Sequence, residues 1–364
     1  MPLPLAIIGL DSVQRDWLQV AADLRDAGEI ELVAAGHRTV AAARDIADAL
    51  KSPAHPVIPA YDDLRLLLKE TAPRIILLDR PANAPLDFLL TCVKQGIGLF
   101  SLGPPVESFA EAQGLSGALE ARTHLLYIWP RFADAPGLAH CAQADEYIRP
   151  VRFIAGRWLG MNHALAKVRG DATDTGGHSL TVRSLCPLAW DALSTLIRLI
   201  DLPTSVFAGI RGNAGADASF ADLSGAASVT LRFPEDAIAS LVICDQAPLS
   251  ATGPASWDSR ELLIWGAGGT LRLGTHSYEF RNTDGTLVDE GPPGAAAAPP
   301  SAAVSREQAQ HALREFFRHY QLPPSPHRGW AHRLEEVAAT LEALVVSHRT
   351  GQPEFPGRFR HLRR

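Results

Sequence analysis

Residues 5–14 read LAIIGLDSVQ: an apolar run ends at Gly9 and leads into a short polar stretch. A run of this length bounded by a glycine is typical of a buried strand. Apolar side chains then recur at helical spacing over residues 13–27. A strand that passes through a turn into a helix opens a β-α-β unit, so this stretch predicts a parallel sheet covered by helices on both faces.

The same alternation continues through the first third of the chain and changes after it. It predicts strands at 31–35, 74–79 and 99–102 and helices at 39–50, 62–70 and 85–95. From residue 151 onward, segments with every second residue apolar predict a mostly antiparallel sheet, interrupted by one helix at 188–200. We therefore expect an α/β protein with a doubly wound parallel sheet, followed by an α+β domain with a large open sheet.

The length of 364 residues is about twice that of a usual domain. We place the first domain at residues 1–122 and the second at 123–364, whose closing helices at 306–350 pack back on the molecule. The net charge of −6 gives no reason to expect a nucleic-acid partner or an anionic membrane surface. Four widely separated cysteines indicate neither a metal site nor a disulfide framework.

Targeting signals are not evident in the sequence. The N-terminus has no basic segment before its apolar run, and no apolar run approaches the roughly 18 residues of a membrane span. We expect a cytoplasmic protein with a small-molecule partner and no membrane contact.

Six short segments, in order, connect the chain to a known family: AIIG at 6–9, YDDL at 61–64, RIILLDRP at 74–81, QGIG at 95–98, WPRF at 129–132 and LIWGAGGTL at 263–271. With them the chain resembles the Gfo/Idh/MocA family, the glucose-fructose oxidoreductase and inositol dehydrogenase group, over nearly its whole length. The resemblance implies a Rossmann domain for NAD or NADP and hydride transfer on a sugar or cyclitol hydroxyl. It also implies a homodimer or homotetramer formed through the open sheet of the second domain.

The family's cofactor turn, Gly-x-Gly-x-x-Gly, falls on Gly9, Asp11 and Gln14. The second glycine lets the backbone approach the cofactor's diphosphate, and a carboxylate there adds bulk and negative charge. Repulsion of about 1 kcal/mol in water, and several times more in a partly buried site, would weaken binding roughly tenfold to a thousandfold. The candidate cofactor residues of the turn are Gly9, Leu10, Asp11 and Ser12; alternatively, Asp11 or Ser12 only caps the following helix.

The second predicted strand is followed by AGHRT at 35–39, without the acidic residue that holds an NAD ribose. His37 and Arg38 could hold a 2′-phosphate instead, which favours NADP over NAD; the alternative is a solvated loop arginine. By resemblance, Arg80 and Pro81 complete the candidate cofactor-binding set.

The family's catalytic lysine lies in a Glu-Lys-Pro motif after the strand at 99–102. This chain has SLGPP at 101–105, which puts Gly103 at the lysine position. Only four lysines exist in the chain, and Lys167 alone lies in an irregular stretch of the second domain.

The family's Asp and His pair, four residues apart, is also missing. Depending on the anchor, its positions fall on Pro187 and Asp191 or on Val182 and Cys186. Asp191 could accept a proton, or it could be a first-turn carboxylate that complements the helix dipole. His178, with Asp171 and Asp174, could transfer protons or bind a metal, or could belong to an exposed loop. The catalytic candidates are Asp191 and His178, and no metal is expected.

Two functions remain open. The chain is either a divergent oxidoreductase that uses NADP or NAD, held reversibly or permanently, or a non-catalytic relative that binds a ligand or a protein. In the second case the alternative is that it binds no cofactor.

Overall fold

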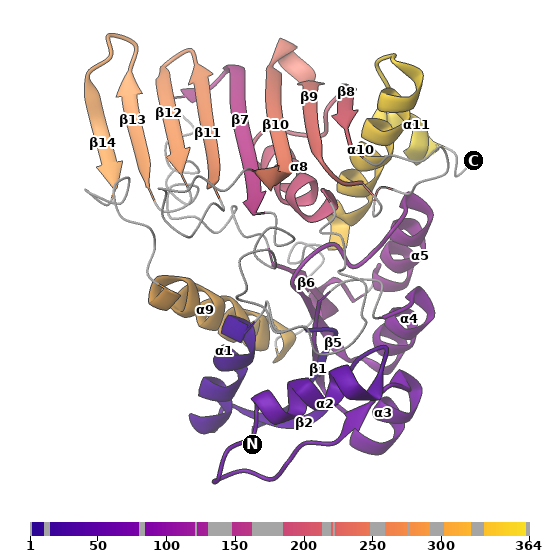
Figure 1. The fold of residues 1–364 in the computed structure, drawn as a ribbon. Coiled ribbons are helices and arrows are strands. Elements are labelled where there is room, and N and C mark those ends of the chain that lie inside the picture. Colours follow the sequence, from indigo (N-terminus) through magenta and orange to yellow (C-terminus); the bar gives the residue numbers. More distant parts are fainter. Residues whose placement is uncertain are drawn as a thin grey trace. The chain divides into compact units, whose positions relative to one another are not determined.

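The computed structural model describes residues 2–10, 15–79, 84–120, 122–129, 148–161, 185–212, 220, 223–247, 259–274, 277–291, 302–321 and 331–361 (Figure 1). The chain divides into two compact units, Met1–Trp129 with Pro300–Glu335 and Pro130–Pro299 with Glu336–Arg364. The predicted fold class is confirmed, because the first unit contains a six-stranded parallel sheet and the second an eight-stranded, mostly antiparallel one.

The sheet of the first unit has the strand order β3-β2-β1-β4-β5-β6, and every neighbouring pair is parallel. Its strands are β1 (Leu3–Ile8), β2 (Ile30–Gly36), β3 (Ala60–Tyr61), β4 (Ile75–Leu78), β5 (Gly98–Ser101) and β6 (Leu126–Ile128). The chain runs outward from β1 to β3 and then returns to the other side of β1. This reversal between β1 and β4 defines a doubly wound sheet.

Helices connect these strands and cover both faces of the sheet. They are α1 (Arg15–Asp26), α2 (Val40–Ala49), α3 (Leu64–Thr71), α4 (Leu86–Gln95) and α5 (Phe109–Leu119). Side chains of α1 and α2 share one hydrophobic cluster with inward residues of β1, β4 and β5. On the other face, α3 packs so closely on β2 that a Cβ at Gly36 would lie 2.9 Å from Leu64 Cδ2.

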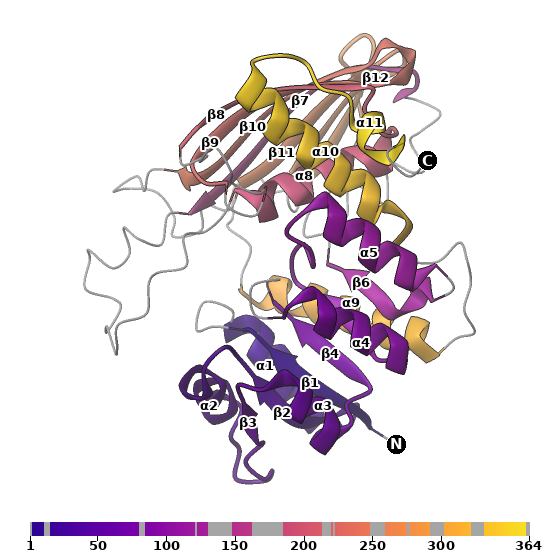
Figure 2. The same cartoon turned by 90° about the vertical axis from the view of Figure 1, so that its right-hand side faces the viewer.

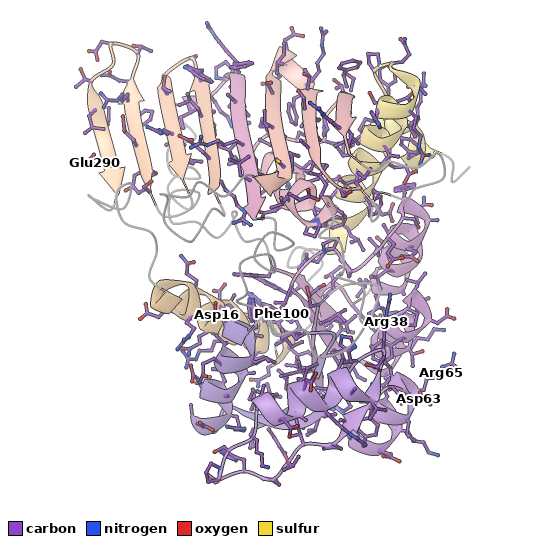
Figure 3. All side chains as sticks on the ribbon, in the orientation of Figure 1. Asp16, Arg38, Asp63, Arg65, Phe100 and Glu290 are labelled. Atoms are coloured by element: carbon purple, nitrogen blue, oxygen red, sulfur yellow. The ribbon has the colours of Figure 1, made fainter. Side chains whose placement is uncertain are left out.

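A helix from the C-terminal part of the sequence completes the first unit. α9 (Ala302–Gln321) contributes Leu313, Phe316 and Phe317 to the same cluster as α1. The Phe316 ring lies 5.7 Å from the ring of Phe100 on β5, and Phe100 is labelled in Figure 3. The predicted division puts this segment in the second domain; in the structure its apolar face belongs to the first unit.

The second unit is built on a sheet with the order β14-β13-β12-β11-β7-β10-β9-β8. All neighbours pair antiparallel except the central β7 and β10, which are parallel. The strands are β7 (Val151–Met161), β8 (Ser205–Arg211), β9 (Ala226–Arg232), β10 (Ile238–Ala247), β11 (Ser259–Gly266), β12 (Gly269–Gly274), β13 (Tyr278–Asn282) and β14 (Leu287–Gly291). Its helices are α8 (Cys186–Leu199), α10 (Ala331–Thr350, which begins in the first unit) and α11 (Pro356–His361).

One face of this sheet is covered and one edge is protected. α8 packs against β7 and β10 (Figure 2). At the β8 edge, the N–H groups of Ala208 and Ile210 donate to Ser347 Oγ (3.1 Å) and His348 Nδ1 (3.2 Å) of α10. These contacts occupy strand-edge donors that would otherwise be open to pairing with another chain.

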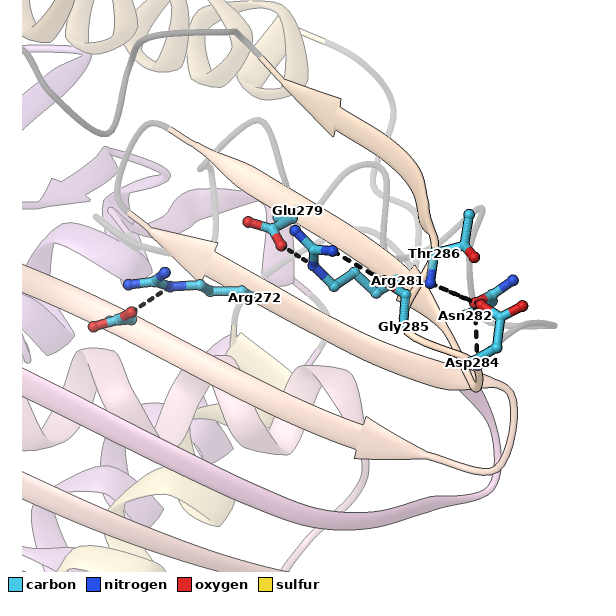
Figure 4. A network of polar contacts seen from close by, with 8 residues as sticks. Arg272, Glu279, Arg281, Asn282, Asp284, Gly285 and Thr286 are labelled. Carbon is cyan, nitrogen blue, oxygen red and sulfur yellow. Dashed lines mark hydrogen bonds and ion pairs between the residues drawn. The ribbon is translucent and has the colours of Figure 1, made fainter.

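The opposite edge carries a hairpin held by side-chain contacts (Figure 4). In the turn between β13 and β14, Asn282 Oδ1 accepts the N–H groups of Asp284 (3.2 Å) and Thr286 (3.0 Å). Hydrogen bonds from Thr286 hold the pKa of the Asp284 carboxyl below its ordinary value. These local contacts hold the turn in place.

Gly36→Ala should destabilise the first unit by about 1–3 kcal/mol, because the new methyl group would press on Leu64, Leu67 and Ile8. Gly103→Ala is the matched control, since a Cβ at Gly103 meets no atom within 4 Å. Its expected effect is within about 0.5 kcal/mol. Urea unfolding measures both, and equal midpoints for the two variants would contradict the close packing at Gly36.

Candidate functional site

The candidate cofactor site lies at the carboxyl edge of the six-stranded sheet, where β1 and β4 are neighbours. Ligands of doubly wound sheets bind at this edge, at the point where the strand order reverses. The edge is held together by backbone hydrogen bonds: Gly9 N–H donates to Gly36 O (2.9 Å), Asp79 N–H to Ile8 O (3.0 Å) and Leu102 N–H to Leu78 O (2.8 Å). The residues that follow β1, β2 and β4 are thereby set side by side.

Gly9 directly follows β1 and has a φ of 77°, in the left-handed region that favours glycine. The side chain of Leu10 is buried in the hydrophobic cluster, so only its backbone can contribute to a ligand site. Asp11 and Ser12 lie outside the described residues. Their predicted roles, as phosphate contacts or as helix caps, stay predictions.

His37 and Arg38 directly follow β2, at the same edge. His37 N–H donates to Tyr61 O (3.0 Å), which fixes the backbone at the strand end. Thr39 Oγ1 accepts the N–H of Ala42 (3.3 Å) and caps α2. Between these anchors the Arg38 side chain, labelled in Figure 3, is exposed. The only carboxylate of β2 is Glu31, near the opposite end of the strand.

A buried carboxylate follows β4. Asp79 is buried at this edge, in a segment quoted above for its family resemblance but without a predicted role. A carboxylate directly after the fully apolar strand IILL was the sequence signal that could have singled it out. The candidates Arg80 and Pro81 come next and lie outside the described residues.

Gly103 stands at the position that the resemblance assigns to the family's catalytic lysine, and space for a side chain exists there. Ser101, fully buried at the end of β5, donates from Oγ to Gly103 O (2.6 Å), and a Cβ built on Gly103 meets nothing within 4 Å. Lys69 and Lys94 lie in the last turns of α3 and α4, which lead back to the amino edge of the sheet. Lys51 follows α2 in the same way, and Lys167 lies outside the described residues. No lysine of the described residues therefore stands at the carboxyl edge.

Asp191 lies in a buried ion pair of the second unit. Its Oδ2 lies 2.8 Å from Arg260 Nε and accepts the Trp158 indole N–H at 3.2 Å. Trp158 and Arg260 are directly opposite each other on β7 and β11, so one carboxylate on α8 joins the helix to two strands. Each buried charge is compensated by the other.

The alternative prediction for Asp191, a first-turn carboxylate that complements the helix dipole, is wrong. α8 begins at Cys186 and has no acidic residue in its first turn, so Asp191 lies one turn further along. Sequence reasoning missed its partner Arg260. The signal was its position in an alternating strand, where it shares the inward face with Leu262 and Ile264.

The second catalytic candidate, His178, lies outside the described residues, as do Asp171 and Asp174. Among the residues that the structure does describe, no group of three or more His, Cys, Asp or Glu side chains could hold a metal ion. No helix within this part of the chain is long and apolar enough to cross a membrane.

No protein-family model and no curated protein sequence matches the chain. Solved structures do match. An oxidoreductase from Agrobacterium radiobacter in complex with NAD+, L-tartaric acid and magnesium is 14% identical, with a TM-score of 0.72 over 98% of this chain and 99% of that one. Levoglucosan dehydrogenase in complex with NADH and levoglucosan is 12% identical, with a TM-score of 0.72 over 98% and 99%.

A third structural match is the WlbA dehydrogenase from Bordetella pertussis in complex with NADH and UDP-GlcNAcA. It is 13% identical, with a TM-score of 0.67 over 98% of this chain and 99% of that one. At such identities the likeness shows the fold. This chain has the two-domain fold of these three oxidoreductases.

Breaking the Asp191–Arg260 pair should be costly, because either single substitution leaves one charge buried without its partner. We expect Asp191→Leu to destabilise the second unit by about 3–5 kcal/mol. The double variant Asp191→Leu/Arg260→Met should be more stable than the sum of the single variants implies. Urea unfolding of the four proteins gives the coupling energy, and additive effects would contradict a direct ion pair.

Proposed function

We propose that this protein is a divergent member of the Gfo/Idh/MocA family that binds NADP in preference to NAD at the carboxyl edge of its parallel sheet. The observation that carries the proposal is the exposed Arg38 directly after β2, on a strand that carries no carboxylate at this end. At that position a carboxylate would bind the ribose of NAD, whereas an arginine accommodates the 2′-phosphate of NADP. The strand reversal between β1 and β4 and the NAD or NADH named for the structural matches support the same site.

The residues present fit the adenosine half of the cofactor best. Arg38 and His37 stand where the 2′-phosphate would lie, and the left-handed Gly9 permits the turn from β1 towards the diphosphate. Asp11 opposes the diphosphate by its charge, so binding should be weaker than with a glycine there. When bound, the nicotinamide would supply the acceptor for a hydride from a substrate carbon.

The substrate side of the proposal is a sugar-like molecule with free hydroxyl groups. Its support is the ligands named for the structural matches, levoglucosan and UDP-GlcNAcA. At the position of the family lysine, Gly103 has no side chain, so a proton from a substrate hydroxyl must go to another group. Asp191 is committed to Arg260 and Trp158, and is a poor choice for that group.

A second candidate function is a non-catalytic relative that binds a sugar-like ligand without turnover. It is favoured by the lack of a side chain at Gly103 and by the pairing of Asp191 with Arg260 and Trp158. The two functions differ in one measurement. Turnover of NADP with a polyol panel supports the enzyme, whereas ligand binding without any reduction of the cofactor supports the non-catalytic relative.

We also propose that two copies associate through the uncovered face of the eight-stranded sheet. Phe153, Phe207 and Val242 point to that face and are 40%, 47% and 50% exposed. Phe153 packs against Trp265 on the neighbouring strand, with ring centroids 5.3 Å apart. Exposed apolar side chains gathered on one surface are typical of a protein interface.

Charged side chains lie beside this apolar surface. Glu261 pairs with Arg157 (2.7 Å) and with Arg272 (2.6 Å; Figure 4 shows the Arg272 contact). All three belong to the same face. Arg157 is opposite Glu261 in the register of β7 and β11, and Arg272 is opposite Leu263, two residues along β11 from Glu261. An apolar centre bordered by charges of both signs suits a second copy of the same surface.

Arg38→Ala should weaken NADPH binding about 10- to 100-fold, because it removes one charged contact with the 2′-phosphate. NADH binding should not change. Arg65→Ala, an exposed arginine of the same unit on α3 that Figure 3 labels, is the matched control and should leave both affinities unchanged. Isothermal calorimetry at low salt measures them, and equal loss of NADPH affinity in both variants would contradict a specific site at Arg38.

Val242→Arg should convert the dimer into a monomer without loss of fold, because Val242 is half exposed in a single copy and would be buried between two. Leu66→Arg on α3, similarly exposed at 41% but in the first unit, is the control and should stay dimeric. Sedimentation equilibrium measures the mass. The proposed surface is excluded if the Val242 variant assembles as the wild type does.

A further inference from the structure

The last segment of the second unit carries a local positive charge that the charge of the whole chain conceals. Residues 345–364 contain five arginines and one carboxylate, Glu354, so the segment has a net charge of +4 in a chain of −6. The arginines are Arg349, Arg358, Arg360, Arg363 and Arg364. The expectation of no membrane contact rested on the charge of the whole chain, and this segment departs from that average.

Hydrogen bonds fix the start of this segment to the sheet. Val206 N–H donates to Glu354 O, and Glu354 N–H donates to Val206 O, both at 2.8 Å. Ser347 Oγ of α10 donates to Gln352 O at 2.7 Å. The residues before α11 therefore lie along the edge strand β8, and α11 begins from a fixed position (Figure 1).

Phe355, which directly precedes α11, places an aromatic ring at the surface. It is 42% exposed, although phenylalanine is usually buried. The Arg358 guanidinium lies 4.8 Å from the centre of this ring, and the Arg358 side chain is 69% exposed. Glu354 Oε2 lies 3.8 Å from Arg358 Nη1, so it compensates this exposed charge only weakly. A cation and an exposed aromatic ring thus stand together on one surface.

The sequence continues this combination along α11. Phe355, Phe359 and Leu362 are four and three residues apart, which is the spacing of one face of a helix. Leu362 lies outside the described residues. Amphipathic segments that combine arginine with phenylalanine and leucine lie on membrane surfaces, with the apolar side chains at the boundary between headgroups and acyl chains.

An anionic bilayer suits this surface better than a duplex nucleic acid does. Both attract arginine side chains. The paired and stacked bases of a duplex offer no apolar boundary to the Phe355 ring, whereas a bilayer does. Each arginine close to an anionic bilayer strengthens binding about fivefold, so that several arginines on one segment give a substantial gain.

We propose that the segment from Glu354 through α11 binds the surface of an anionic lipid bilayer without crossing it. Phe355 inserts at the headgroup boundary. Arg358, together with the exposed Arg349 in the last turn of α10, contacts lipid phosphates. This contact needs neither NADP nor a second copy of the chain, so it is independent of the proposed function.

Co-sedimentation of the full chain with vesicles tests the charged contacts. Vesicles of equimolar phosphatidylglycerol and phosphatidylcholine should bind wild type, and vesicles of phosphatidylcholine alone should not. Arg349→Gln/Arg358→Gln removes two exposed charges and should weaken binding about 25-fold. Arg44→Gln/Arg65→Gln, at two exposed arginines of the first unit, is the matched control and should bind as wild type does. No binding of wild type to the anionic vesicles, or an equal loss in both double variants, overturns the proposal.

Phe355→Ala tests the apolar contact in the same assay. It should weaken binding to the anionic vesicles about tenfold, because the ring no longer leaves water. Leu66→Ala is the control, since Leu66 is similarly exposed at 41% but lies in the first unit. The Tm of each variant should match wild type, because the substituted side chains are exposed. Unchanged vesicle binding by Phe355→Ala, or tighter binding of wild type to duplex DNA than to the vesicles, overturns the proposal.

Discussion

The central position of β1 is the constraint on which the first unit depends. The strand pairs in parallel with β2 on one side and β4 on the other, and its inner residues Leu5 to Ile8 are fully buried. A strand buried on both faces must be apolar throughout, and here it is. The chain leaves the sheet at the end of β1, between β2 and β4. The left-handed Gly9 and the residues after it therefore lie where the strand order reverses. The position of the candidate cofactor site follows from this pairing.

In the second unit, the parallel pair of β7 and β10 has a comparable role. Two parallel strands end at the same edge, so Asp245 on β10 lies at the edge where β7 also ends. α8 crosses both strands and is joined to the sheet through Asp191, Arg260 and Trp158. Of the two buried carboxylates, Asp191 has its charge compensated and holds the helix. Asp245 accepts the N–H of Gly225, and burial raises the pKa of its carboxyl to about 6.

Much of the fold could be predicted from the sequence because strands and helices differ in apolar period. The run LAIIG, the helix signals after it and the alternation from residue 151 onward were sufficient to predict one parallel and one mostly antiparallel sheet. The prediction missed α5, whose sequence contains the helix-disfavouring Gly114 and Gly117, and the short strands β3 and β6. It also placed α9 in the second domain. The apolar face of an amphipathic helix indicates that the helix packs against a core, but it does not identify the sheet on which that helix lies.

The candidate site was less predictable, for physical reasons. Asp191 was expected in the first turn because the predicted helix began at 188; α8 begins two residues earlier, with Pro187 in its first turn, where proline is tolerated. A buried ion pair such as Asp191–Arg260 and a buried carboxylate such as Asp245, which accepts the N–H of Gly225, depend on the pairing of distant strands. Periodicity within one segment gives the direction of a side chain but not its partner.

The most direct test of the central claim, that the carboxyl edge of the parallel sheet binds NADP, is a crystal structure of the protein grown with NADP+. The account predicts the dinucleotide across the ends of β1 and β4, with the 2′-phosphate against the Arg38 guanidinium. Density for the cofactor elsewhere, or at this edge with its ribose away from Arg38, would contradict it.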